Sequence, residues 1–482
     1  MSDISVSTNN FLLSLPWQFD TVNVFSALRY LPYAVLLDSA DANHPDARFD
    51  IIAAEPLAKV WTTTKDGSNL CHLQHFDTAG KVTATSETTQ EPLTVVHQLL
   101  AQYFPQPLAS DLPFSGGAIM ALSYDLGRQY EQLPSHAADD LAFPQLMAGI
   151  YAWALIRDNQ QPLGQQWQLV TADANIDLTA LAARLVKMIT TATAAPLSFS
   201  LTSAWQTQLT QQQYLAKFSR IQEYLHSGDC YQINLTQRFS ASYQGDEWQA
   251  YQLLRASNGA PFSAFFHWDG LSVLSISPER FLKLSNRGEI ETKPIKGTAP
   301  RSSDSAEDQR LASELQQSEK NRAENLMIVD LLRNDIGKVA AAGSVSVPKL
   351  FDIESFPAVH HLVSTVTAQL PPQLHASDLL RGAFPGGSIT GAPKIRAMEI
   401  IDELEPSRRS IYCGSIGYIS QDGGMDSSIT IRTLLGQQGQ LYCWAGGGIV
   451  ADSEGAAEYQ ETFDKVSKIL PILAPTSAQS DQ

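Results

Sequence analysis

Short apolar runs of strand length recur along this 482-residue chain and limit the folds that it can adopt. In the first part they lie at residues 33–37, 117–124 and 149–156. Further candidate strands, which alternate with predicted helices and glycine-rich loops, lie at residues 272–277, 289–295, 414–420, 428–433 and 441–445. The short length of these segments favours strands over helices. We therefore predict an α+β protein built from many short strands.

Apolar residues at helical spacing predict the helices between these strands. The clearest helix begins after Thr210, a good capping residue, and ends at Gly228. Others are predicted at residues 305–334, 393–404 and 455–470.

The chain is longer than one ordinary domain, and its best linker candidate is the Thr-, Ala- and Ser-rich segment 190–203. We predict an N-terminal region of residues 1–205 and a second region of residues 206–474. The polar tail, residues 475–482, is predicted to be disordered.

The net charge of −17 argues against nucleic acid or an anionic membrane as a partner, because both require an excess of Lys and Arg. A small anionic substrate is compatible with this charge if a few basic groups gather locally.

The four cysteines, Cys71, Cys230, Cys413 and Cys443, are far apart and predict reduced, mostly buried thiols. The polar N-terminus lacks the pattern of a signal peptide, and no apolar run approaches the ~18 residues of a membrane span. These features predict a cytoplasmic protein.

Two glycine-rich segments are candidate binding loops. Residues 386–391 resemble the start of a phosphate loop, but Ala392-Pro393 replaces the Lys-Ser/Thr pair of a Walker A motif. Backbone N–H groups there could still bind an anion, or the loop could simply require small residues. Residues 445–450 follow a predicted strand and leave the same two alternatives open.

Several charged residues carry a similar ambiguity. Glu324 lies on the apolar face of its predicted helix, where either a salt bridge or a metal could offset its burial. Glu458 and Glu461 lie one turn apart, so they could bind a hard cation, or Glu461 could pair with Lys465 on a solvated face.

Lys296 ends a predicted strand and is either an ordinary exposed lysine or a nucleophile with a lowered pKa. A hairpin would bring Glu279 to the same end of the sheet, as an acid or base or as one half of a turn salt bridge.

Taken together, these segments form an ordered series of motifs: Ser277-Pro-Glu-Arg280, Pro294-Ile-Lys-Gly-Thr298, residues 322–335, His361-Leu-Val-Ser364, residues 384–394, Thr430-Ile-Arg-Thr433, residues 445–450 and Glu458-Tyr-Gln-Glu-Thr462. From about residue 210 to about residue 470, the series resembles the chorismate-utilising enzymes, which include anthranilate and isochorismate synthases. Arg48-Phe-Asp50 and Asp125-Leu-Gly-Arg128 are similar to segments of the members that work with a glutaminase.

The resemblance implies the fold of anthranilate synthase component I, an α+β sandwich of two large antiparallel sheets flanked by helices, with the active site in a cleft. The segment 190–203 would then join parts of one intertwined core.

Within this family, lysine at position 296 marks the enzymes that form 4-amino-4-deoxychorismate, whereas anthranilate and isochorismate synthases have alanine there. The resemblance implies that Lys296 adds at C2 of chorismate as the C4 hydroxyl departs. Ammonia then adds at C4 and expels the lysine. Glu279 resembles the family's acid/base, and His361 the histidine near the C4 hydroxyl.

The remaining site residues are carried over from the same motifs. Mg2+ would be held by Glu324, Glu458 and Glu461. The substrate would be bound by Arg432, Gly447, Gly448, Tyr412, Lys465 and Thr298.

Related aminodeoxychorismate-forming enzymes can hold a structural tryptophan, and the residues that match its pocket are Leu37, Ser39, Asp46, Arg48, Phe49, Pro261, Phe262 and Ser263. Asp46 departs from the pattern, which has an aromatic residue at this position.

The resemblance therefore implies an amino-group transferase that makes 4-amino-4-deoxychorismate for 4-aminobenzoate and folate synthesis. No Cys-His-Glu glutaminase site is evident in the sequence, so a separate glutamine amidotransferase subunit is expected to supply ammonia. The alternatives are anthranilate synthase component I, which Lys296 disfavours, and a non-catalytic amino-acid-binding homologue.

Overall fold

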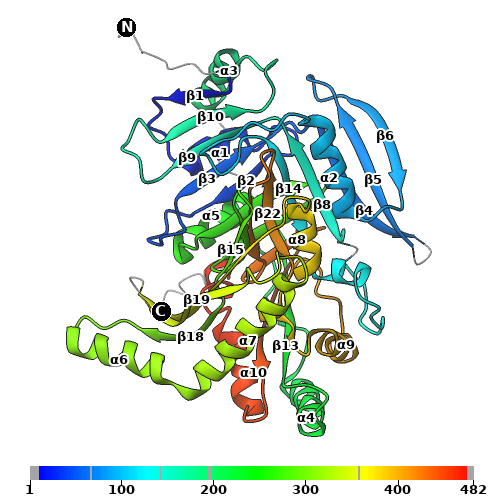
Figure 1. The fold of residues 1–482 in the computed structure, drawn as a ribbon, viewed down its shortest axis with the longest axis vertical. Coiled ribbons are helices and arrows are strands. Elements are labelled where there is room, and N and C mark those ends of the chain that lie inside the picture. Colours follow the sequence, from blue (N-terminus) through cyan, green and yellow to red (C-terminus); the bar gives the residue numbers. More distant parts are fainter. Residues whose placement is uncertain (1–9, 66–67, 142, 193–197, 356–358, 475–482) are drawn as a thin grey trace, which may run out of the picture.

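The computed structural model describes residues 10–65, 68–141, 143–192, 198–355 and 359–474, so the predicted tail and the middle of the predicted linker lie outside the described residues. The described chain forms two large antiparallel sheets flanked by helices (Figure 1). The predicted fold class is confirmed.

The first sheet has 13 strands. Its main path is β1 (Leu12–Leu15), β10 (Trp167–Thr171), β9 (Trp153–Asp158), β3 (Phe49–Ala53), β2 (Val35–Asp38), β14 (Phe262–Trp268), β15 (Leu271–Ser277), β24 (Thr433–Gln437), β25 (Gln440–Ile449), β13 (Gln232–Gln244) and β11 (Ser200–Leu201). Off this path, β13 also pairs with β12 (Gln206–Thr207) and β21 (Gly391–Ala392).

The second sheet has 12 strands. Its main path is β18 (Ile295–Pro300), β20 (Val359–Gln369), β17 (Glu289–Thr292), β16 (Arg280–Leu284), β23 (Met425–Ile429), β22 (Ser415–Ser420), β7 (Gly117–Leu122), β8 (Leu146–Tyr151), β4 (Ala58–Lys65), β5 (Ser68–Phe76) and β6 (Val82–Thr88). The twelfth strand, β19 (Ser346–Ser355), pairs with β20.

The main core lies between the sheets, as strand alternation requires. Along β14, Ala264 and Phe266 share one core with Ile416 of the other sheet. Phe265, between them, points to the opposite face and packs in a second core with Trp248 of α5.

The helices cover the outer faces and the ends of the sheets (Figure 1). They are α1 (Thr21–Leu28), α2 (Pro92–Tyr103), α3 (Leu178–Thr191), α4 (Gln211–Ser227), α5 (Glu247–Asn258), α6 (Ser305–Gln317), α7 (Glu319–Gly337), α8 (Ala376–Ala383), α9 (Lys394–Leu404), α10 (Gly455–Asp464) and α11 (Leu470–Leu473), with 3-10 turns η1 (Tyr124–Gln129) and η2 (Gly387–Ile389). None of the described helices is long and apolar enough to cross a membrane.

Each sheet contains strands from both sides of residue 205. β2 pairs with β14 in one sheet, and β7 pairs with β22 in the other. The two predicted regions therefore share their sheets, as an intertwined core would. The boundary at residue 205 itself stays a prediction.

Helix α4 forms as predicted. Thr210 and Gln213 make a reciprocal capping box at its start, and Gly228 ends it in the left-handed conformation, φ 81°. The prediction of a single helix at residues 305–334 is wrong, because Ser318 separates α6 from α7. Ser318 caps α7, since its side chain accepts a hydrogen bond from Asn321 N. The last predicted helix ends early, at Asp464.

Residues 149–156 and residues 428–433 were each predicted as one strand, but in the structure each segment contributes to two strands that lie in different sheets. Ala152 separates β8 from β9, and residues 430–432 separate β23 from β24. Residues 149–156 are continuously apolar because both halves are buried, and in residues 428–433 the alternation of Ile429 and Ile431 with polar residues continues through the bend, so neither pattern reveals the change of sheet. The strand predicted at residues 289–295 likewise breaks before Ile295.

A third crossing, at Pro278-Glu279, joins β15 to β16 and lies beside the crossing at residues 430–432. Ile429 N donates to Glu279 O at 3.0 Å, and Ile276 N donates to Arg432 O at 3.1 Å. Arg432 has φ 50°, a strained value for a residue with a side chain. Two predicted site residues thus lie where the chain passes from sheet to sheet.

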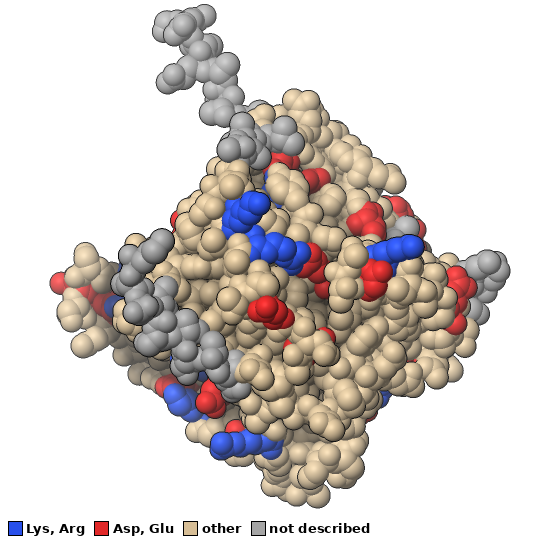
Figure 2. Space-filling view, turned by 90° about the horizontal axis from the view of Figure 1, so that it is seen from above, with Lys and Arg blue, Asp and Glu red and all other residues tan. Residues whose placement is uncertain are grey.

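The charge distribution on the surface and the state of the cysteines agree with what the sequence predicts. Figure 2 shows one face of the molecule, on which acidic and basic side chains are interspersed and form no broad basic area. All four cysteines are free and buried, as predicted.

Candidate active site

Lys296 is the second residue of β18 and is partly buried. Its Nζ lies 3.5 Å from the carbonyl oxygen of Ser388, which is a weak hydrogen bond. Burial lowers the pKa of Lys296, nearby Glu279 opposes this effect, and Lys465 adds to it. The environment therefore favours the neutral amine that a nucleophile requires.

Glu279 shares this environment. Its Oε1 accepts a hydrogen bond of 3.0 Å from Ser388 Oγ. Burial raises the pKa of Glu279, whereas Lys296 and the Ser388 hydroxyl act in the opposite direction. A carboxyl group with a raised pKa is suited to acid–base work.

His361 of β20 faces Thr298 across the β18–β20 ladder. Thr298 Oγ1 and His361 Nδ1 lie 2.8 Å apart and share a hydrogen bond. Burial, reinforced by the charge of Arg432, lowers the pKa of His361 to about 4. The imidazole is therefore neutral at pH 7 and can act as a hydrogen-bond partner instead of a cation.

Glu458 and Glu461 of α10 face the backbone of β25. A Cβ built on Gly447 would lie 3.0 Å from Glu458 Oε2 and 3.0 Å from Glu461 Oε1. Glu458 Oε1 accepts a hydrogen bond of 2.6 Å from Ser453, but the buried Oε2 has no hydrogen-bond partner in the described chain. Such an orphaned oxygen usually marks a missing ligand or water.

Glu324 of α7 lies near the same carboxylates. Burial raises its pKa, Lys296 and Lys320 oppose this effect, and the charge of Glu461 adds to it. Within the described ranges, no three His, Cys, Asp or Glu side chains are arranged to hold a metal ion as they stand. The set of three carboxylates and the orphaned oxygen nevertheless have the chemistry of a hard-cation site.

Lys465 donates to Glu461 Oε1 and to the carbonyl of Gly446, each at 2.7 Å. The Glu461–Lys465 pair, one of the two alternatives, is therefore present, and the metal role of Glu461 stays a prediction. Tyr412 is buried, with its ring stacked on Trp444 at 6.0 Å between centroids. Its contact with substrate stays a prediction.

Sequence reasoning missed three polar residues of the site. Besides Ser388, these are Gln232 and Asn234 of β13, whose side chains are joined by a hydrogen bond of 3.2 Å. A Cβ on Gly448 would meet both side chains, at 2.7 and 3.0 Å. Polar residues alternating with Ile233 and Leu235 were the signal that could have found them.

The predicted tryptophan pocket coincides with a cavity of about 500 Å3. Seven of its eight predicted residues line that cavity, namely Leu37, Asp46, Arg48, Phe49, Pro261, Phe262 and Ser263. Asp46, which departs from the family pattern, lies 2.9 Å from Arg280 Nη1. Arg280 also stacks on the Phe262 ring at 4.9 Å and binds Asp426.

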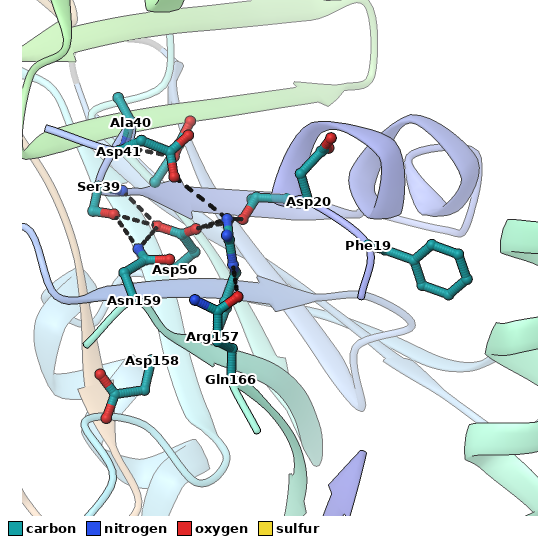
Figure 3. A network of polar contacts seen from close by, with 12 residues as sticks. Phe19, Asp20, Ser39, Ala40, Asp41, Asp50, Arg157, Asp158, Asn159 and Gln166 are labelled. Carbon is teal, nitrogen blue, oxygen red and sulfur yellow. Dashed lines mark hydrogen bonds and ion pairs between the residues drawn. The ribbon is translucent and has the colours of Figure 1, made fainter. Parts of the chain in front are cut away.

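Ser39 is not among the residues that line this cavity. Its hydroxyl donates to Asp50 at 2.5 Å and accepts from Asn159 at 2.8 Å, within the buried network that Figure 3 shows. A contact between Ser39 and tryptophan therefore stays a prediction.

Comparisons with known proteins agree with this fold. The family model described as chorismate binding enzyme matches residues 34–471. The chain therefore belongs to the chorismate-binding enzyme family.

Within the family, this chain is similar to aminodeoxychorismate synthase component 1. The protein of that name from Escherichia coli (strain K12) is 54% identical over 470 residues, which cover 96% of this chain and 98% of the relative. The one from Klebsiella aerogenes is 55% identical over 464 residues, with the same coverage. The crystal structure of anthranilate synthase component I from Streptococcus pneumoniae TIGR4 superposes with a TM-score of 0.73 at 31% identity, covering 89% of this chain and 93% of that one.

Proposed function

We propose that this chain converts chorismate and ammonia into 4-amino-4-deoxychorismate, for 4-aminobenzoate and folate synthesis. The observation that carries the proposal is Lys296, a partly buried amine with a lowered pKa beside Glu279. The names of the relatives support the same reaction.

In the first step, the neutral Nζ of Lys296 forms a bond to C2 of chorismate. The ring double bond shifts and the C4–O bond breaks. A raised pKa favours the protonated form of Glu279, which gives its proton to the departing hydroxyl, so that water leaves. The adduct is a secondary ammonium that joins Lys296 to C2.

In the second step, ammonia forms a bond to C4, the double bond shifts back, and the C2–N bond breaks. Lys296 departs as a neutral amine, and the new C4 ammonium gives one proton to the Glu279 carboxylate. The net change is chorismate plus ammonia to 4-amino-4-deoxychorismate plus water, with the enzyme restored.

The other site residues bind and orient the substrate. Arg432 is exposed at its sheet crossing and lies within electrostatic range of Glu279, so it can pair with a substrate carboxylate. His361, which Thr298 holds by a hydrogen bond, would contact the C4 hydroxyl as a neutral group. The backbone of Gly447 lies against side chains of α10, and that of Gly448 lies against side chains of β13. Neither position has space for a side chain larger than hydrogen.

Glu324, Glu458 and Glu461 would hold Mg2+. When bound, this cation would neutralise a substrate carboxylate and relieve the repulsion among the three glutamates. Lys465, already paired with Glu461, would orient that ligand.

We further propose that a separate glutamine amidotransferase subunit supplies the ammonia, since relatives are named component 1, and that the 500 Å3 cavity binds tryptophan. The candidate active site and the cavity are adjacent in sequence, because Glu279 belongs to the active site and Arg280 lines the cavity.

The test is product analysis by mass spectrometry after incubation with chorismate, Mg2+ and excess ammonium. We expect 4-amino-4-deoxychorismate from the unmodified chain, and loss of that product or a shift towards anthranilate for Lys296→Ala. Anthranilate from the unmodified chain would instead support the anthranilate synthase reaction and contradict the proposal.

A further inference from the structure

The loop between α8 and α9 brings Ser388 to both Lys296 and Glu279. Within the loop, Thr390 Oγ1 donates to Gly386 O at 3.1 Å, and from outside it Arg409 Nη1 donates to Ile389 O at 2.8 Å, but neither contact joins the loop to α7. Gly386 and Gly387 are packed between two elements. A Cβ on Gly387 would lie 2.6 Å from Leu331 Cδ2 of α7, and one on Gly386 would lie 3.2 Å from Ile429 Cδ1 of β23. The glycines allow close approach but provide no polar anchor.

Lys394, the first residue of α9, supplies such an anchor. Its Nζ donates to Asp335 Oδ2 at 2.7 Å, to Ala383 O at 2.9 Å and to Pro385 O at 2.9 Å. All three donors of the ammonium are therefore used, and only 10% of the side chain is exposed. One buried cation thus joins the start and the end of the loop to α7.

Asp335 is the matching acceptor on α7, and its side chain is fully buried. Its other oxygen, Oδ1, accepts a hydrogen bond of 3.2 Å from Lys338, whose side chain is 46% exposed and whose next contact, Gly382 O, is at 3.4 Å. Asp335 therefore has two lysine partners, of which only Lys394 binds the carbonyl of Pro385.

The same helix α7 carries Glu324, a candidate Mg2+ ligand. We propose that Lys394 is a positioning residue for the reaction: with Asp335, it fixes the Ser388 loop to α7 and so sets Ser388 against Glu279 and Lys296. This proposal rests on the proposed function for the roles of Lys296 and Glu279. The ion pair of Lys394 with Asp335, which touches no reacting atom, thus adds a polar link between the loop and α7 to the packing of Gly387 on Leu331.

The experiment compares Lys394→Met with Lys338→Met in the full chain, with Mg2+ and excess ammonium. Both variants remove one cation from the same carboxylate, so the charge change is matched. For Lys394→Met, we expect kcat to fall on the order of 10- to 100-fold, since small misplacement of catalytic groups has effects of this size. The KM for chorismate should change by less than about threefold, and Lys338→Met should keep kcat within about twofold.

A Ser388→Ala background separates positioning from general damage to the fold. If Lys394 acts through Ser388, the double variant should be scarcely slower than Ser388→Ala alone, because the two losses are not independent. Losses that multiply in the double variant, or equal losses for Lys394→Met and Lys338→Met, would overturn the proposal.

Rates are followed as chorismate consumption, so the comparison holds whichever product forms, and the identity of the product tests the proposed function separately. If Lys394→Met does not fold, Asp335→Asn gives the same test. It weakens the link to α7 while leaving both carbonyl bonds of Lys394 in place, and an unchanged kcat would then contradict the proposal.

Discussion

Two buried polar clusters of this molecule differ in how completely their central charged groups are paired. In the cluster around Asp50 (Figure 3), the carboxylate accepts hydrogen bonds from Ser39 N at 2.9 Å, Ser39 Oγ at 2.5 Å, Asn159 Nδ2 at 3.3 Å and Thr21 Oγ1. Arg157 lies 3.7 Å away and supplies a charge of opposite sign.

The cluster around Lys296 is incomplete by comparison. Lys296 has one long contact, at 3.5 Å, and Glu458 Oε2 has no hydrogen-bond partner in the described chain. Fully paired buried groups stabilise a fold, whereas unpaired ones destabilise it and persist where a ligand completes them. We therefore expect a structural role for the first cluster and a functional role for the second.

The largest effect should follow from Glu279→Gln, which keeps the size of the side chain and removes its acid–base function. We expect kcat to fall by about 10²- to 10⁴-fold, the usual contribution of a positioned acid or base. Thermal stability should stay the same or rise, because burial disfavours the charged carboxylate. Steady-state kinetics and calorimetry provide the two measurements, and a variant that loses stability but keeps kcat would reverse the assignment.

Asp50→Ala should have the opposite profile. It leaves Ser39, Thr21 and the nearby Arg157 without their buried acceptor, so the free energy of unfolding should fall by about 3 kcal/mol. Its kcat should remain near that of the unmodified chain at a temperature where the variant is folded. Urea denaturation measures the loss, and a large fall in kcat at full folding would show that this cluster also serves the reaction.

Glu458→Gln should stabilise the metal-free protein by about 2 kcal/mol at pH 8, by removing a buried charged oxygen that lacks a partner. Burial raises the pKa of Glu458 in the folded chain. The folded state therefore binds this proton more tightly than the unfolded state, and the unmodified chain recovers stability as pH falls through that raised pKa. The advantage of the variant should shrink accordingly.

Added Mg2+ should reverse the sign of this difference, because it stabilises only the chain that retains the ligand. Melting curves of both proteins at pH 8 and at pH 5, with and without Mg2+, test these statements together. A variant that gains as much from Mg2+ as the unmodified chain would remove Glu458 from the metal site.

The smallest effect concerns Ser39. Ser39→Ala should lower the free energy of unfolding by about 1–2 kcal/mol, because Asp50 and Asn159 each lose a hydrogen bond to the Ser39 hydroxyl. Tryptophan affinity, measured by calorimetry, should be unchanged, whereas Phe262→Ala, which alters the wall of the cavity, should weaken it. A weakened affinity in Ser39→Ala alone would place Ser39 in the pocket that the family pattern predicted.

Local rules were enough to predict much of the fold. Thr210 and Gly228 bound α4 because capping depends on neighbouring residues only. The crossings at Ala152 and residues 430–432 were missed because the bend interrupts neither the apolar run of the first segment nor the alternating pattern of the second.

The site was predictable where a motif carries it, and was missed where tertiary contacts create it. Lys296 and Glu279 were predicted as site residues from their motifs, and in the structure both lie against Ser388. Ser388 and Lys394 lie within a motif that was recognised, but their roles depend on contacts with residues far apart in sequence, Glu279 and Asp335. No spacing in the sequence shows such contacts.

The most direct test of the central claim is capture of the Lys296 adduct. The chain is incubated with chorismate and Mg2+ without ammonia, then quenched and analysed by intact-protein and peptide mass spectrometry. The account predicts a mass increase equal to chorismate minus one water, on the peptide that contains Lys296, and its disappearance when ammonium is added. Continued turnover with ammonium, but no such adduct at any time point, would contradict the lysine mechanism.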